Sequence, residues 1–320
     1  MIAVGAAVIA PRAAFAQSQQ GRLPRIAYLS GRSGLPDPSR EAILQGLSEL
    51  GYVDGKNIRF EHHYFGNRMD QVPVDIPRLV ETTDIIVSAT FILIEAVVKV
   101  TKTVPIVFLS NQDPVAAGMV ASLARPGGNI TGISRLTHTL SGKRLELLKE
   151  AIPGFARAAV LQDANEKMSA DSHQHYAAAA RTLKIELTPL LVRRPNPDLE
   201  GAFRAALKER AGALVVIRNT LLLGHSRPIA DLAIRHRLPS MCEGSEFIDA
   251  GGLISYAPND FENFKRTAYF MDKILKGAKA GDLPIEQPTK FELIINLKTA
   301  KALGIKIPQS VVVRADKVIA

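Results

Sequence analysis

The stretch that decides the fold of this chain is DPVAAGMVASLARPGGNITGIS, at residues 113–134. Asp113 and Pro114 form a helix-entry pair, because an aspartate caps the first backbone N–H groups and a proline has none that would go unpaired. The apolar residues that follow predict a short helix, which residues 125–128 end, and residues 129–133 predict a short extended segment. Strand–helix alternation precedes and follows this stretch. We therefore interpret it as the junction of two similar α/β halves, which suggests a cleft that closes.

The halves on either side of this junction predict the same architecture. Strands are expected in the first half at residues 25–30, 57–64, 84–88 and 105–109, and helices after Asp37 and at residues 69–82 and 91–100. The second half predicts helices at 141–151, 169–183, 199–209, 228–236, 259–277 and 298–303, with strands at 157–161, 185–191, 213–217, 240–242, 253–256 and 291–296. Apolar strands that alternate with helices indicate doubly wound parallel sheets. The expected fold is α/β, with two such lobes in tandem.

The composition and the N-terminus indicate an exported protein. With 320 residues, 47% hydrophobic and 22% charged, the chain is ordinary globular material and long enough for two domains. Residues 1–16 resemble the end of a secretory signal peptide: an apolar run leads to an A-x-A site and then to polar residues. The basic n-region is missing, so we expect the true start a few residues upstream. A single cysteine, Cys242, permits no intrachain disulfide. The expected location is a Gram-negative periplasm.

The net charge of +9 does not by itself identify a partner. The basic residues are scattered and form no stripe, and no interleaved aromatic platform, helix-turn-helix or zinc-ligand spacing accompanies them. We therefore expect no nucleic-acid partner. The charge is consistent with a mild attraction to an anionic ligand or surface. A monomer is the expected state.

The sequence matches none of the catalytic or metal-binding motifs considered below. Residues 127–132 lack the G-x-G-x-x-G spacing and follow a predicted helix, whereas a dinucleotide-binding loop follows a strand. His62 and His63 would point to opposite sides of a strand, and His173 and His175 would not share a helix face. The carboxylates are dispersed, so no pair is placed for acid–base chemistry. The sequence predicts a binding protein without catalysis, metal or cofactor.

Candidate ligand-binding residues follow the predicted strand ends. In open α/β sheets a ligand lies beyond the carboxyl ends of the strands, where helix N-termini favour an anionic group. The candidates are Ser30, Ser33, Ala89, Thr90, Phe91, Ser110, Asn111, Asp113, Asn165, Asn219, Glu243 and Tyr256. Phe91 and Tyr256 could stack on a flat ligand, and Ser110, Asn111 and Asn219 could bind its polar groups. Alternatives stay open, since Ser33 could only shape a turn, Asp113 only cap a helix, and Phe91 only fill the core.

Several blocks of the chain together resemble a known family. They include ELGYVDGKNIRFEHHY at residues 49–64, VPIVFLSNQDPVAAGMVASLARPGGNITGIS at 104–134 and LPIEQPTKFELIINLKTAKALG at 283–304. These blocks are similar to substrate-binding proteins of ABC transporters, in the TrpX-like family with the type I periplasmic-binding fold. The likeness covers most of residues 25–319. Three segments depart from the usual family pattern, at residues 89–92, 161–165 and 255–257.

The resemblance implies a domain organisation and a partner. Two lobes, at residues 24–133 plus 257–289 and at 134–256 plus 290–320, would be joined by three crossings near residues 133, 257 and 289. They would close around a small organic ligand, an amino acid or an aromatic or carboxylate-bearing compound, and deliver it to an ABC permease in the inner membrane. Two other functions stay open: a periplasmic ligand-sensing module that feeds a receptor or kinase, and an exported α/β enzyme.

Overall fold

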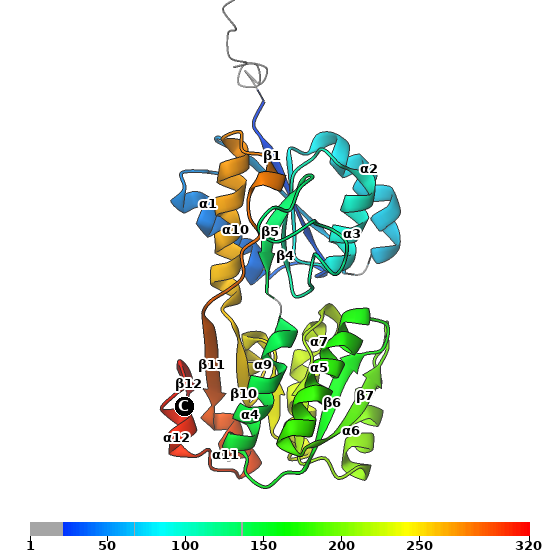
Figure 1. Cartoon of the computed structure of the whole chain (residues 1–320), viewed down its shortest axis with the longest axis vertical. Helices are drawn as coiled ribbons and strands as arrows, with labels where there is room; N and C mark the ends of the chain where they lie inside the picture. Colours follow the sequence, from blue (N-terminus) through cyan, green and yellow to red (C-terminus); the bar gives the residue numbers. More distant parts are fainter. Residues whose placement is uncertain (1–21, 67, 136) are drawn as a thin grey trace, which may run out of the picture.

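The computed structural model describes residues 22–66, 68–135 and 137–320. The predicted signal peptide, residues 1–16, lies outside the described residues. Figure 1 shows two α/β bodies, one above the other along the longest axis. The upper body contains the first sheet and is called the first lobe here, and the lower body contains the second sheet and is called the second lobe. Among the described residues, no helix combines the length and the apolar character that a bilayer span requires.

The first lobe is built on a five-stranded parallel sheet of order β2-β1-β3-β4-β5. Its strands are β1 (Arg25–Ser30), β2 (Arg59–Tyr64), β3 (Ile85–Ser88), β4 (Ile106–Ser110) and β5 (Ile130–Ser134). Its helices are α1 (Pro38–Glu49), α2 (Val72–Thr82) after the 3-10 turn η1 (Met69–Gln71), and α3 (Phe91–Val100). Helix α1 and the distant α10 (Asp260–Leu275) pack on one face of the sheet, and α2 and α3 pack on the other (Figure 1).

The second lobe is built on a seven-stranded sheet of order β12-β11-β10-β9-β8-β6-β7. Its strands are β6 (Arg157–Asp163), β7 (Glu186–Val192), β8 (Ala213–Val216), β9 (Ser240–Cys242), β10 (Ile254–Pro258), β11 (Phe291–Asn296) and β12 (Lys317–Ile319). One face carries α4 (Ser141–Ala151), α5 (Lys167–Leu183), α11 (Leu297–Leu303) and α12 (Gln309–Val312). The other carries α6 (Leu199–Lys208), α7 (Thr220–Gly224), α8 (Ser226–Arg235) and α9 (Ser245–Asp249).

The chain connects the two sheets three times. It leaves the first sheet after β5 and enters the second lobe through the 3-10 turn η2 (Thr137–Leu140). It returns from β10 to α10, passes the turn η3 (Ala280–Asp282) beside β5, and re-enters the second sheet at β11. Because the chain leaves by β10 and comes back from the same side, β10 and β11 run antiparallel in an otherwise parallel sheet. The predicted α/β fold with two doubly wound lobes is confirmed, with this one antiparallel pair added.

The prediction of a helix after Asp113 was wrong. The Asp113 carboxylate does accept hydrogen bonds from the backbone N–H groups of Val115 and Ala116, at 2.8 and 3.2 Å. However, the chain makes only one turn, which closes with a bond from the Met119 N–H to the Pro114 carbonyl. Gly118 ends the turn at φ +69°, a left-handed conformation that stops a helix. The apolar residues beyond it therefore never reach a second helical turn.

Candidate functional site

A cleft of about 1060 Å³ lies between the two lobes. One wall includes the loops that follow β1, β2, β3 and β4, and the other includes residues that follow β6, β7 and β8. The walls come close at Gly31 and Thr220, since a β-carbon on Gly31 would lie 3.3 Å from the Thr220 Cγ2 atom. Both walls are therefore formed where parallel strands end, as expected from the sequence.

Serines at three neighbouring strand ends shape the first wall. The hydroxyl oxygens of Ser30, Ser88 and Ser110 accept hydrogen bonds from the backbone N–H two residues further on, at 3.2, 3.2 and 3.0 Å. Each bond bends the chain away from its strand into a turn. The Thr90 hydroxyl accepts a bond from the Gly31 N–H at 2.8 Å and so ties the first two turns together. This wall is held by short polar contacts between side chains and backbone.

Eight of the twelve candidate residues line this cleft. They are Ser30, Ser33, Ala89, Thr90, Phe91, Ser110, Asn111 and Asn219. The Asn219 amide is already engaged, because its oxygen caps α7 at the Leu222 N–H and its nitrogen donates to the Ser169 hydroxyl. The Asn111 amide oxygen differs: it is buried and has no hydrogen-bond partner among the described residues. That any of the eight binds a ligand stays a prediction.

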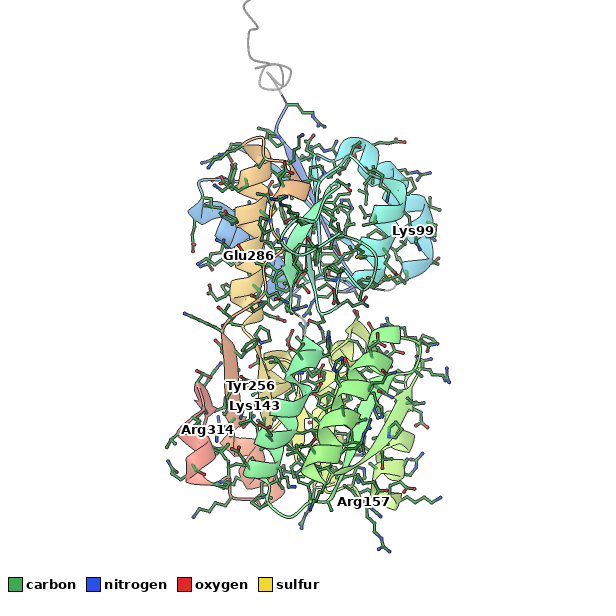
Figure 2. All side chains as sticks on the ribbon, in the orientation of Figure 1. Lys99, Lys143, Arg157, Tyr256, Glu286 and Arg314 are labelled. Atoms are coloured by element: carbon green, nitrogen blue, oxygen red, sulfur yellow. The ribbon has the colours of Figure 1, made fainter. Side chains whose placement is uncertain are left out.

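The other four candidates lie outside the cleft lining. Asp113 caps the single turn described above, and Asn165 is exposed, with its backbone N–H bonded to the Asp163 carboxylate. Glu243 is buried and accepts bonds from the Arg144 guanidinium at 2.9 Å and from the Tyr176 hydroxyl at 2.8 Å, so its carboxylate is engaged inside the second lobe. Tyr256 packs its ring on Phe291, with 6.0 Å between centroids, and Figure 2 shows it within the second lobe.

A buried ionic cluster connects the cleft to the crossings between the lobes. The crossing cluster comprises Arg135, which follows β5, Arg218, which follows β8, Glu246 in α9 and Asp260 at the start of α10. Asp260 pairs with both arginines, and Arg218 also pairs with Glu246. Both arginines line the cleft. Sequence reasoning missed this cluster, although a charged residue directly after a buried strand was a usable signal.

Pairing within the crossing cluster opposes the effect of burial on its pKa values. Burial alone would raise the pKa of Asp260, but Arg135 and Arg218 outweigh it and hold that pKa below the ordinary value. Burial would likewise lower the pKa of Arg218, yet Asp260 and Glu246 keep it above the ordinary value. Asp260 and Arg218 are therefore held in their charged states, whereas at Arg135 burial outweighs the pairing with Asp260 and leaves the pKa of that guanidinium below its ordinary value. Losing one member of the cluster leaves a buried charge uncompensated.

Glu166 is a second cleft residue that sequence reasoning missed. Burial raises the pKa of its carboxyl to about 7, with a further upward contribution from nearby Asp163 and a downward one from Arg194. The Ser169 hydroxyl donates a hydrogen bond to the Glu166 carboxyl at 3.2 Å. Glu166 stands immediately before α5, so the cleft wall carries a carboxyl group that titrates near neutral pH.

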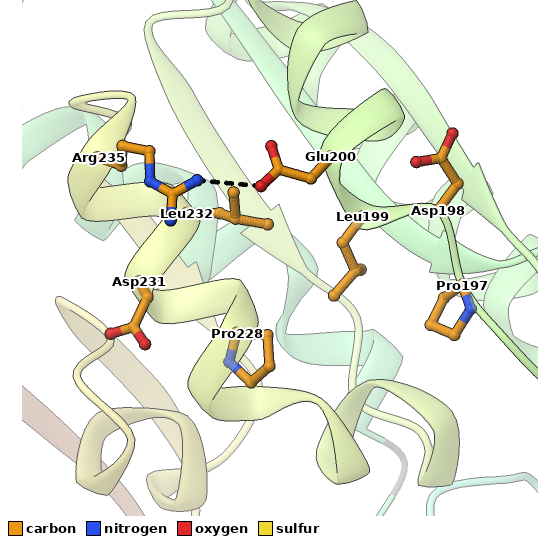
Figure 3. A pocket seen from close by; sticks show the side chains of 8 residues that line it. All are labelled: Pro197, Asp198, Leu199, Glu200, Pro228, Asp231, Leu232 and Arg235. Carbon is orange, nitrogen blue, oxygen red and sulfur yellow. Dashed lines mark hydrogen bonds and ion pairs between the residues drawn. The ribbon is translucent and has the colours of Figure 1, made fainter.

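A smaller hollow of about 430 Å³ lies elsewhere, between α6 and α8 of the second lobe (Figure 3). Its ion pair, between Arg235 and Glu200 at 3.0 Å, is exposed on both sides. None of the twelve candidate residues lines it. Within the part of the chain that the structure describes, no three His, Cys, Asp or Glu side chains are grouped to hold a metal ion. The cleft between the lobes is therefore the candidate ligand site.

Comparison with known proteins identifies the family. The model of the ABC transporter substrate binding protein family matches residues 32–319. The chain belongs to this family. The match spans both lobes and the cleft between them, and it confirms the resemblance drawn from the sequence blocks. The family is one of substrate-binding proteins rather than enzymes.

Individual relatives of this substrate-binding protein agree with the assignment. A tyrosine-binding protein of Clostridioides difficile strain R20291 is 26% identical over 275 residues, which cover 84% of this chain and 77% of that protein. A conserved domain protein of Vibrio cholerae has a TM-score of 0.85 at 25% identity, over 93% of this chain and all of that one. An ABC domain from Streptococcus pneumonia, solved in complex with L-Trp, has a TM-score of 0.84 at 24% identity, with the same coverage. The predicted type I periplasmic-binding fold is thus confirmed.

Proposed function

We propose that this chain is a periplasmic solute-binding protein of an ABC importer. It captures a small organic ligand, an amino acid or an aromatic or carboxylate-bearing compound, in the cleft as the lobes close. The lobes comprise residues 24–133 plus 257–289 and 134–256 plus 290–320. The protein is exported by its N-terminal signal peptide, acts as a monomer without a cofactor, and hands its ligand to an inner-membrane permease.

The single observation that carries this proposal is the cleft at the strand ends of both sheets. Its volume of about 1060 Å³ is just above the usual range for small-molecule sites. Its lining combines guanidinium groups of Arg135 and Arg218 with apolar side chains such as Phe91 and Leu221. Closing two lobes around such a site would bury a ligand on both sides, and it would create a distinct state for the permease to recognise.

The chemistry of the ligand is supported by two independent features. Guanidinium groups suit a carboxylate, with which they form charge-assisted hydrogen bonds. Relatives over most of the chain are a tyrosine-binding protein and a domain solved with L-Trp. Both features favour a carboxylate attached to an apolar or aromatic body.

Thermal-shift melts of residues 17–320 against amino acids, aromatic acids and small sugars test this proposal. A ligand at 100 times its dissociation constant should stabilise the fold by about 2.7 kcal/mol, which is several degrees in melting temperature. Mass spectrometry after hours of incubation should recover the ligand unchanged. Consumption of the ligand, or a flat response to the amino acids and aromatic acids, would contradict the proposal.

Two matched tryptophan variants locate the binding site. Thr220→Trp places a large ring where the cleft walls approach each other, and it should abolish the melting shift. Asp231→Trp places the same ring in the smaller hollow between α6 and α8 and should leave the shift unchanged. A loss of the shift in Asp231→Trp alone would move the site out of the cleft.

A further inference from the structure

Three helices of the second lobe end in the same unusual way. After α5, α6 and α8 the chain turns toward the next strand through a residue in the left-handed conformation. These residues are Lys184, Arg210 and Arg237, at φ +55°, +55° and +51°. Each turn is closed by two backbone hydrogen bonds in the pattern of a Schellman motif. Within the part of the chain that the structure describes, no other residue except glycine has a positive φ.

Glycine is the residue expected in such a turn. Any other side chain is strained there, because its β-carbon comes too close to the following carbonyl oxygen. The same motif ends α1, α9, α10 and α11, and there the left-handed residue is Gly51, Gly251, Gly277 or Gly304. A basic residue that keeps a strained backbone at three separate helix ends indicates that its positive charge has a function.

The three basic residues lie in a row at one edge of the second sheet, and we call them together the basic edge. They precede β7, β8 and β9, which run parallel to β6 in the order β9-β8-β6-β7. Parallel strands start at the same edge, and neighbouring strands are about 5 Å apart, so the row is about 15 Å long. Figure 2 shows Arg157, at the start of β6, at the end of the second lobe that is far from the first lobe.

The charges of the basic edge are available to a partner. All three residues are exposed, and none forms an ion pair with a described residue. The neighbouring Glu186 carboxylate is paired with Arg157 instead, at 2.7 Å. Glu209 stands between Lys208 and Arg210 in the sequence, so that connection still carries a net positive charge.

The shape of the basic edge favours an extended partner over a small anion. None of its residues lines the cleft or the hollow between α6 and α8, so the charges lie on an open surface. Separate positive charges on long side chains are complementary to a surface of many negative charges, such as anionic phospholipid head groups. The basic edge is at the opposite end of the second sheet from the strand ends that line the cleft, so a membrane bound there leaves the cleft free.

We propose that the basic edge binds reversibly to the anionic phospholipid surface of a membrane. Each Lys or Arg near an anionic bilayer strengthens binding by about fivefold, and the attraction acts over about one Debye length. Three such side chains give a weak, salt-sensitive association that concentrates the protein at the membrane without anchoring it. This inference goes beyond the proposed function, since it involves neither the cleft nor its ligand.

Co-sedimentation of residues 17–320 with lipid vesicles tests the proposal. At low ionic strength the protein should sediment with vesicles of equal parts phosphatidylcholine and phosphatidylglycerol. It should stay in solution with vesicles of phosphatidylcholine alone, and also with the mixed vesicles at about 0.5 M salt. The triple variant Lys184→Gly, Arg210→Gly and Arg237→Gly should bind the mixed vesicles about a hundredfold more weakly.

A second triple variant is the matched control. Lys56→Gln, Arg78→Gln and Lys99→Gln remove the same charge from exposed positions of the first lobe, and this protein should keep most of the binding. An effect of net charge alone would weaken both triple variants equally.

The melting temperature of the glycine variant separates this role from a structural one. A basic side chain near a helix C-terminus can also interact with the last carbonyl groups and with the helix dipole. If that were its role, the glycine variant would melt at a lower temperature than wild type. Relief of the left-handed strain should instead leave the melting temperature equal or higher.

Four results would overturn the inference. They are the absence of a preference for the anionic vesicles, binding that survives in the glycine variant, equal losses in the two triple variants, and a glycine variant that melts at a lower temperature. Binding to a DNA oligonucleotide without binding to vesicles would also overturn it. Thermal-shift melts with cleft ligands are independent of these measurements, so either proposal can fail while the other stands.

Discussion

At Glu166 the fold keeps a carboxyl group in a partly buried wall of the cleft. Burial disfavours its charged form and raises its pKa to about 7 from an ordinary value of 4.5. Between these two values the folded protein holds a proton that the unfolded chain has released. The free energy of unfolding should therefore fall as the pH rises through this window, and the loss is complete above the folded pKa.

The variant Glu166→Gln removes this pH dependence. The glutamine oxygen can still accept the bond from the Ser169 hydroxyl, but it carries no charge to desolvate. At about pH 8 the variant should be more stable than wild type by roughly 1–3 kcal/mol, and at about pH 4.5 the two should be equal. Urea denaturation at several pH values measures the difference. A stability difference between Glu166→Gln and wild type that does not change with pH would refute the raised pKa of Glu166. Glu81→Gln, on the exposed face of α2, is the control and should show no such pH-dependent difference.

At the scale of elements, the contact between α1 and α10 holds the first lobe together across the sequence. Gly46 of α1 lies directly against α10, since a β-carbon there would be 2.4 Å from the Lys265 carbonyl oxygen and 2.9 Å from the Ala268 Cβ atom. Close by, the Tyr52 hydroxyl donates to the Asp272 carboxylate at 3.0 Å. A helix from the second half of the chain thus completes the core of the first lobe.

Substituting Gly46 by alanine tests this packing, because local and tertiary effects have opposite signs. In an isolated helix Gly→Ala is stabilising by about 1 kcal/mol. Here the added methyl group would clash with the backbone of α10, which can move only if the whole helix shifts. Gly46→Ala should therefore destabilise the protein by roughly 1–3 kcal/mol in urea denaturation. Ser48→Ala, on the exposed side of the same helix, should change the stability little. A Gly46→Ala protein as stable as wild type would contradict the close crossing.

Element positions were largely predictable from the sequence, and the errors have local causes. Helix α3 and strand β9 match their predicted bounds, because apolar periodicity and short apolar runs are signals within a few residues. The prediction of a helix after Asp113 was wrong. Asp113 does cap the first turn as predicted, but Gly118 ends that turn before a helix can form. The short helices α7 and α9 carry too few residues to show a helical period.

For the whole molecule, the crossing cluster is the contact that links the lobes through charge. Asp260, at the start of α10, pairs with Arg135 at the end of the first sheet and with Arg218 at the end of β8 in the second. These groups come from positions far apart in the chain. A single, partly buried carboxylate thereby joins both sheets at the point where the chain crosses between them.

The variant Asp260→Asn should show how much the molecule depends on this carboxylate. It leaves the buried Arg135 guanidinium without its carboxylate partner and Arg218 with Glu246 alone, so the free energy of unfolding should fall by about 3–5 kcal/mol. The control Glu200→Gln breaks the exposed pair with Arg235, whose side chains are 53% and 63% accessible, and should cost less than about 1 kcal/mol (Figure 3). Urea denaturation measures both variants. Equal losses would mean that the crossing cluster contributes no more than a surface ion pair.

The sequence by itself determined the α/β class, the order of most elements and the strand ends that line the cleft. Caps, apolar periods and strand-end residues act over a few positions, so they can be recognised along the chain. The tertiary structure alone decided that β10 and β11 run antiparallel and that Arg135 and Arg218 share Asp260. It also decided that Glu243 pairs with Arg144 and that Tyr256 packs on Phe291, both inside the second lobe. The physical reason is distance along the chain. Arg135 and Asp260 are 125 residues apart, and a pattern within a few residues cannot indicate which charged side chains will pair in the fold.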